Sequence, residues 1–240
     1  MVCRVYEAGQ VVYSEAYQLQ CELRRLRIEA TIPDVLLLLE HPPTLSVGKR
    51  GRMENVLVPM EELRRENIAL FFSERGGDVT YHGPGQMVAY PILSLKERGR
   101  DVYQFVRDLE TAALCTLADF GITAERDEKH AGVWVGGAEI AAVGLSIKKW
   151  VTMHGLALNV NPDLSHFSLI HPCGLAGVKA TSMAELLGGP VSMQAVRTAF
   201  VRHFSLVLGL PVLPGNFGDL RGLYPAGFQK PVRRKDRPPP

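Results

Sequence analysis

The chain has 240 residues, of which 46% are hydrophobic and 22% charged. These are values of an ordinary globular protein, and they exclude wholesale disorder, collagen and coiled-coil arrays. The formal net charge of +2 is too small to indicate a nucleic-acid-binding protein, and because residues 230–237 hold five basic side chains and one acidic one, the rest of the chain carries −2.

Cysteine usage and hydropathy indicate a protein of a reducing compartment without a membrane-spanning segment. The chain contains four cysteines, at positions 3, 21, 115 and 173, without a CxxC pair. A protein of this length does not depend on disulfides, so we expect free thiols and a cytoplasmic location. The charged N-terminus lacks the apolar segment of a signal peptide. The longest aliphatic run, residues 35–39, is too short to span a membrane.

The first third of the chain predicts alternating strands and helices. Residues 3–8 are predicted as a strand, and residues 14–28 as an amphipathic helix with apolar side chains spaced by three and four. The apolar run 34–40 is typical of a buried strand. Further on, the expected order is a short strand at 44–48, a basic loop at 49–52, a helix at 59–66, a strand at 68–73 and a strand at 87–95.

The remainder predicts a helix, a group of strands and two more helices. Residues 101–120 form a clear helical pattern that ends before Gly121. The expected strands are 132–135, 140–147 and 155–161, and the last helices are 182–187 and 192–208. This mixture, with a hairpin signal at residues 136–137, indicates an α+β fold of mixed sheets flanked by helices.

The C-terminal part of the chain differs in composition. Seven of the sixteen prolines lie in residues 211–240. We therefore expect one domain over residues 1–210, followed by a proline-rich, basic tail over residues 211–240 that is extended or disordered.

The densest chemical signal lies between two predicted strands. Residues 75–86 read Arg-Gly-Gly-Asp-Val-Thr-Tyr-His-Gly-Pro-Gly-Gln. Glycines allow a backbone to approach a ligand closely, and Arg75, Thr80 and His82 could line such a site. The segment lacks the Gly-Lys-Ser/Thr ending of a Walker A loop. From composition alone, a tight turn between strands remains an equal alternative.

A second signal surrounds Cys173, which lies between Pro172 and Gly174. An exposed thiol in such a polar stretch is a candidate nucleophile, although a lone cysteine is more often structural. His166 and His171 are nearby in sequence, but their spacing matches no standard metal site.

Small residues dominate a third region, over residues 137–144 and 153–160. Such residues on neighbouring strands could leave room for a narrow apolar ligand. Close backbone packing inside a sheet is the alternative interpretation.

These segments, in this order, resemble the octanoyltransferases of lipoate biosynthesis, the LipB family. The resemblance runs from about residue 5 to about residue 208. It is carried by residues 36–42, 44–48, 54–55, 75–86, 132–134, 140–144, 154–161, 172–174 and 181–182. The string at 75–86 together with Pro-Cys-Gly is highly specific.

The resemblance implies the α+β fold of biotin and lipoate protein ligases and a two-step acyl transfer. Cys173 would attack octanoyl-acyl carrier protein and then pass the octanoyl group to a lysine of a lipoyl domain. The implied acceptors are the E2 subunits of 2-oxoacid dehydrogenases and the glycine cleavage H protein. No metal, cofactor, nucleic acid or membrane is implied, and the protein is expected to be a monomer. The implied substrate residues are Arg75, Gly76, Gly77, Asp78, Val79, Thr80, Tyr81, His82, Ala142, Val143, Gly144, Gly155, Leu156 and Ala157.

One position departs from the family pattern. Two residues after Gly137 the family normally has a lysine, which lowers the pKa of the catalytic thiol, whereas this chain has Glu139. A neighbouring carboxylate should instead raise the pKa of Cys173.

Three readings follow from this departure. In the first, Glu139 acts as a general base, especially if burial raises its own pKa. In the second, the missing function is supplied by Lys179, His171 or His82. In the third, the protein is a weak or inactive paralogue that binds acyl chains. A lipoate ligase or an amidotransferase of the same fold is a further alternative. The basic loop at 49–52 is a candidate docking site for an acidic carrier protein.

Overall fold

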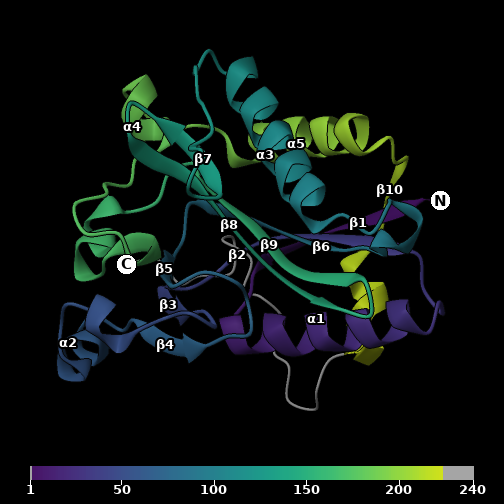
Figure 1. Cartoon of the computed structure of the whole chain (residues 1–240), viewed down its shortest axis with the longest axis horizontal. Helices are drawn as coiled ribbons and strands as arrows, with labels where there is room; N and C mark the ends of the chain where they lie inside the picture. The colour runs from purple at the N-terminus through teal and green to yellow at the C-terminus, as the bar shows by residue number, and fades with distance from the viewer. Residues whose placement is uncertain (1, 224–240) are drawn as a thin grey trace, which may run out of the picture.

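The protein contains a seven-stranded mixed sheet, seen in a computed structural model that describes residues 2–223 (Figure 1). The strand order is β10-β1-β2-β6-β9-β8-β7, in which β1 runs parallel to β10 and β2 and the other neighbours are antiparallel. The strands are β1 (Cys3–Gln10), β2 (Asp34–Glu40), β6 (Gln86–Ile92), β7 (Gly132–Val135), β8 (Ala138–Lys148), β9 (Val151–Asn159) and β10 (Val212–Pro214).

Helices cover both faces of this sheet. Alternate residues of β2 point to opposite sides, so Leu36 and Leu38 join one core while Leu37 and Leu39 join another. Helices α3 (Val102–Asp119) and α5 (Met193–Leu208) pack together over the first core. Helix α1 (Tyr13–Ile28) packs against the second core (Figure 1).

A second, three-stranded sheet lies beside the first and has the order β4-β3-β5. Its strands are β3 (Thr44–Val47), β4 (Ala69–Phe72) and β5 (Val79–His82), and helix α2 (Met60–Arg65) accompanies it. The remaining elements are helix α4 (Met183–Leu187) and the 3₁₀ turns η1 (Met53–Asn55), η2 (Leu95–Glu97), η3 (Leu164–Leu169), η4 (Pro172–Gly174) and η5 (Phe217–Leu223).

The α+β prediction is confirmed: mixed sheets are flanked by helices. All four cysteines are free thiols. Within residues 2–223, no helix combines the length and the apolar character needed to cross a membrane.

Strands β5 and β9 differ from the expectation. Strand β5 lies inside the glycine-rich segment, where no strand was predicted. Strand β9 begins at Val151 rather than at residue 155, because the turn before it uses Lys149 and Trp150, both with positive φ. Neither is a glycine or asparagine, so the usual hairpin signal was missing.

The start of the expected tail is part of the fold. Strand β10 pairs in parallel with β1, and Leu220 in η5 is buried in the core under α1. The expected boundary at residue 210 therefore differs from the structure over residues 211–223. The rest of the tail prediction, residues 224–240, lies outside the described residues.

Candidate active site

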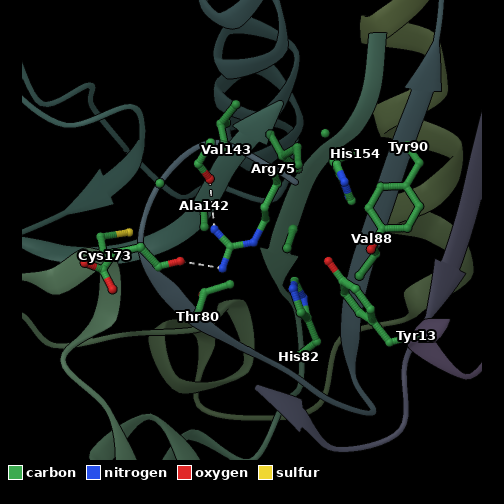
Figure 2. Close-up of a pocket in the computed structure, with 17 residues that line it drawn as sticks. Tyr13, Arg75, Thr80, His82, Val88, Tyr90, Ala142, Val143, His154 and Cys173 are labelled. Carbon is green, nitrogen blue, oxygen red and sulfur yellow. Dashed lines mark hydrogen bonds between the residues drawn. The ribbon is translucent and has the colours of Figure 1, made fainter. Parts of the chain in front are cut away.

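A pocket is lined by residues of strands β8 and β9 and of the glycine-rich segment (Figure 2). Its volume is about 470 Å³ when its open mouth is included. Most of the residues predicted to form a site line it: Arg75, Gly76, Gly77, Asp78, Thr80, His82, Ala142, Val143, Gly144, Gly155, Leu156, Ala157 and Cys173. Four separate stretches of the sequence, 75–82, 142–144, 155–157 and Cys173, thus form one cavity.

Glycines in the pocket walls allow two close backbone approaches. At Gly144, a Cβ atom would lie 3.1 Å from the carbonyl oxygen of Gly76, so the missing side chain lets the glycine-rich segment approach β8. At Gly155, a Cβ atom would lie 2.2 Å from the carbonyl oxygen of Ala89 on β6, so the missing side chain permits close strand packing. Both glycines therefore permit close backbone packing, the alternative interpretation of the small residues, and both also line the pocket.

Arg75 is buried and holds the glycine-rich segment in shape. Its guanidinium donates hydrogen bonds to the carbonyl oxygens of Ser46, Gly76 and Asp78, and to the hydroxyl of Ser46. In these bonds, the dipoles of backbone carbonyl groups compensate the positive charge of the guanidinium. Arg75 thereby supplies a positive charge that favours anionic groups nearby.

Asp78 connects this segment to the neighbouring loops. Its carboxylate accepts hydrogen bonds from the backbone N–H groups of Val79 and Arg52 and from the side-chain amide of Asn55. A Cβ atom at Gly174 would lie 2.8 Å from Asp78 Oδ2, so the turn that carries the cysteine packs directly on this carboxylate. Asp78 therefore has a positioning role between the basic loop and η4.

Cys173 lies at one end of the pocket, in the turn η4 (Figure 2). Its φ is +57°, an unusual conformation for a residue other than glycine, and such strain is found most often at functional sites. The thiol is half-buried and donates a hydrogen bond to Glu139 Oε1, with Sγ and Oε1 3.4 Å apart.

Glu139 lies near the start of β8 and is almost completely buried. Its backbone is fixed by hydrogen bonds with residues 179 and 181, with its N–H donating to the Lys179 carbonyl over 2.8 Å. Burial raises the pKa of Glu139 to about 7, against the opposing effects of the Cys173 thiol and of Arg75. Burial, and next the Glu139 carboxylate, raise the pKa of Cys173 well above its usual range. The site thus pairs a neutral thiol with a carboxylate that changes protonation near neutral pH.

The other candidates for the missing lysine occupy different places. Lys179 is exposed, and its contact with Glu139 is made by its backbone. His82 lines the pocket, but it is hydrogen-bonded to Ser46 and Gln86, and burial lowers its pKa well below the usual value. Within residues 2–223, the titratable side chain that accepts a hydrogen bond from the Cys173 thiol is that of Glu139.

Two predicted substrate residues, Val79 and Tyr81, face away from the pocket. Side chains alternate along β5, so Thr80 and His82 line the pocket while Val79 and Tyr81 enter the core of the small sheet. The Tyr81 hydroxyl bonds His166 Nδ1 over 2.8 Å. The resemblance implied the whole run from Arg75 to His82 as substrate residues, and the alternation along β5 brings only some of its side chains to the pocket.

Other residues of the pocket were not predicted: Tyr13, Val88, Tyr90 and His154. Val88 and Tyr90 share one face of β6, a period-two signal that the sequence does contain. A histidine beside Gly155 in an otherwise apolar strand is also a detectable signal. Nothing in the sequence marks Tyr13, which begins α1. Among residues 2–223, no three metal-ligating side chains come together.

Comparison with known proteins identifies related sequences. The family described as the lipoyl protein ligase A/B catalytic domain matches residues 12–205. An octanoyltransferase of Solibacter usitatus is 48% identical over 213 residues, which are 89% of this chain and 96% of that protein. An octanoyltransferase of Desulforamulus reducens is 44% identical and covers 85% of this chain and 90% of its own.

Solved structures with the same fold are more distant in sequence. A bipartite lipoate protein ligase from Thermoplasma acidophilum superposes with a TM-score of 0.74 at 19% identity, covering 93% of this chain and 90% of that one. A biotin protein ligase from Aquifex aeolicus gives a TM-score of 0.52 at 14% identity, covering 87% of this chain and 70% of that one. The fold is therefore that of biotin and lipoate protein ligases.

Proposed function

Because the chain belongs to the lipoyl protein ligase A/B catalytic domain family, among its octanoyltransferases, we propose that it moves an octanoyl group through a Cys173 thioester. The donor is octanoyl-acyl carrier protein, and the acceptor is a lysine of a lipoyl domain in an E2 subunit or in the glycine cleavage H protein. The observation that carries the proposal is the contact between the Cys173 thiol and the buried Glu139 carboxylate at the end of a narrow pocket.

In the first step, the thiol proton passes to the Glu139 carboxylate as Sγ attacks the thioester carbonyl carbon. The tetrahedral intermediate then breaks the bond to the donor sulfur, which leaves as a thiol after taking the proton back from Glu139. The enzyme now holds the octanoyl group as a thioester. Splitting the transfer into two thioester-level steps lowers the barrier of each one.

In the second step, the lysine amine of the acceptor attacks the acyl-enzyme. Glu139 accepts a proton from the attacking nitrogen, an amide bond forms, and Sγ leaves as a thiol that recovers this proton. A base with a pKa of about 7 suits both transfers, because it is readily protonated and deprotonated at neutral pH. The donor thioester is already activated, so the scheme needs neither metal nor nucleotide.

The shape of the pocket agrees with an acyl substrate. Its walls combine glycines with Ala142, Val143, Leu156 and Ala157, which suit an unbranched hydrocarbon chain. Each buried methylene contributes about 0.8 kcal/mol, so a chain that fills the pocket gains most of its affinity there.

The proposal is tested by the intact mass of the purified protein after incubation with octanoyl-acyl carrier protein. We expect one added octanoyl group on the native chain and on Cys115→Ala, a control thiol outside the pocket, and none on Cys173→Ala. On addition of a lipoyl domain, the group should move to one lysine of that domain.

Two results would overturn the proposal. One is acylation of a lipoyl domain from free octanoate and ATP without a cysteine adduct, which is the chemistry of a ligase. The other is an adduct on Glu139→Lys but none on the native chain, which would make the native protein a binding scaffold without catalysis.

A further inference from the structure

The end of the pocket opposite Cys173 is lined by polar aromatic side chains. Figure 2 shows Cys173 at one side of the cavity and Tyr13, Tyr90 and His154 at the other, with Arg75 and Ala142 between them. An acyl chain attached to Sγ would therefore point its methyl end toward these three rings.

Hydrogen bonds and ring contacts hold this end of the pocket in place. The Tyr90 hydroxyl lies 2.7 Å from His41 Nε2, and Ser73 Oγ lies within hydrogen-bond distance of both the Tyr13 hydroxyl and His154 Nε2. The rings of Tyr90 and His154 meet edge to face. Because all three side chains are buried and tied to neighbours, they form a wall that cannot easily move aside.

His154 adds a chemical barrier to this wall. Its Nδ1 atom is buried and has no hydrogen-bond partner within residues 2–223. Burial, followed by Arg75, lowers the pKa of His154 to about 3, so the ring is neutral. An apolar chain could pass this ring only by displacing it, which would break the hydrogen bond between Ser73 Oγ and His154 Nε2 without replacing it, and this disfavours deeper insertion.

We propose that Tyr13, Tyr90 and His154 form the floor of the acyl pocket, and that His154 is the specificity-determining residue that sets the longest acyl chain the protein accepts. This inference rests on the proposed function, because it takes the pocket to hold the acyl group. Chains up to the length of the apolar walls gain affinity with each methylene, and longer chains meet the floor.

The backbone at His154 makes this idea testable with little strain. His154 has φ of +61°, a conformation that glycine adopts freely and other residues rarely do. Its backbone N–H donates to Gln20 Oε1 over 2.8 Å, a bond that His154→Gly retains. His154→Gly should therefore remove the floor without distorting β9.

The test measures calorimetric binding of hexanoate, octanoate, decanoate and dodecanoate to native protein, His154→Gly and Met153→Ala. Met153 is the buried neighbour on β9, and it does not line the pocket, so Met153→Ala controls for a lost core side chain. We expect the native protein and Met153→Ala to bind octanoate best. In His154→Gly, affinity for decanoate relative to octanoate should rise about tenfold, as two newly buried methylenes predict.

An unchanged preference in His154→Gly, the same shift in Met153→Ala, or no binding of any of the acids would each overturn the inference. The proposed function is tested separately, by the mass of the octanoyl adduct on Cys173. Binding of octanoate with the expected length shift, but without an adduct from octanoyl-acyl carrier protein, would leave the floor established and refute the transferase.

Discussion

At the residue scale, the Cys173 thiol contacts the Glu139 carboxylate, at the position where the family resemblance implies a lysine. A lysine would stabilise the thiolate before the substrate arrives. Glu139 does the opposite, since its charge and the burial of the site keep the thiol protonated. Under the proposed mechanism, catalysis through this pair depends on proton transfer during attack, and the protonation state of Glu139 decides how many molecules are competent.

The rate of acyl-enzyme formation should rise with pH and level off above about 7. Below that value Glu139 is protonated in most molecules and cannot accept the thiol proton. In Glu139→Gln, which has no basic oxygen, the rate should fall by about 10²-fold or more. Quenched intact-mass time courses between pH 5.5 and 8.5 measure both effects.

The matched control for this experiment is Glu125→Gln, which changes an exposed carboxyl and should leave the rate and profile unchanged. A native profile that is flat across pH 7, or a Glu139→Gln variant as fast as the native protein, would contradict general-base catalysis by Glu139.

At the scale of elements, the pocket depends on how closely β9 approaches β6. A Cβ atom at Gly155 would lie 2.2 Å from the Ala89 carbonyl oxygen and 2.5 Å from Pro91 Cδ, both on β6. Gly155→Ala should therefore force the strands apart and reduce the free energy of unfolding by about 2 kcal/mol or more. Urea unfolding measures this loss. Gly189→Ala, at a site with open space around it, should cost far less, and equal midpoints for the two variants would refute the argument.

The basic loop at residues 49–52 is fastened to the rim of the pocket. Backbone N–H groups of Lys49 and Arg50 donate to the carbonyl oxygens of Arg75 and Gly77, over 2.9 and 3.2 Å. The side chains of Lys49, Arg50 and Arg52 are exposed. The loop is therefore a candidate docking site for the acidic carrier protein that we propose as the donor.

Charge reversal in this loop should weaken donor recognition without affecting chemistry. For Lys49→Glu/Arg50→Glu we expect KM for octanoyl-acyl carrier protein to rise about tenfold at low salt, and less at high salt. The rate with octanoyl-coenzyme A, which has no carrier protein, should stay unchanged. Lys148→Glu/Lys149→Glu, at the β8–β9 turn, is the matched control. Equal KM values in the two double variants would remove the loop as a docking site.

At the scale of the whole molecule, residues 211–223 close one side of the fold. Strand β10 covers the edge of β1, and Leu220 is buried under α1. A chain ending at residue 210 should be less stable than one ending at residue 223 by about 2–3 kcal/mol, because it loses the Leu220 side chain from the core. Urea unfolding of the two truncated chains measures the difference directly. Equal stability would show that this segment contributes no net free energy to the fold.

The positions of most elements were predictable because they follow from local periodicity. The apolar spacing over 14–28, 101–120 and 192–208 predicted α1, α3 and α5 to within a residue or two at each end. Strand β5 was missed because glycines surround a four-residue strand. Strand β10 was missed because Pro211 precedes it and Pro214 ends it, and because its pairing with β1 depends on residues more than two hundred positions away.

The sequence by itself determined the fold class, the family and most of the residues that line the pocket, because these are carried by periodic patterns and by short strings of glycine, proline and cysteine. Only the tertiary structure decided which side chains meet. The Cys173–Glu139 contact joins residues 34 positions apart, the register of β5 sends Tyr81 away from the pocket, and three separate elements bring Tyr13, Tyr90 and His154 together. Such contacts depend on strand register and packing, which no local stretch of sequence contains.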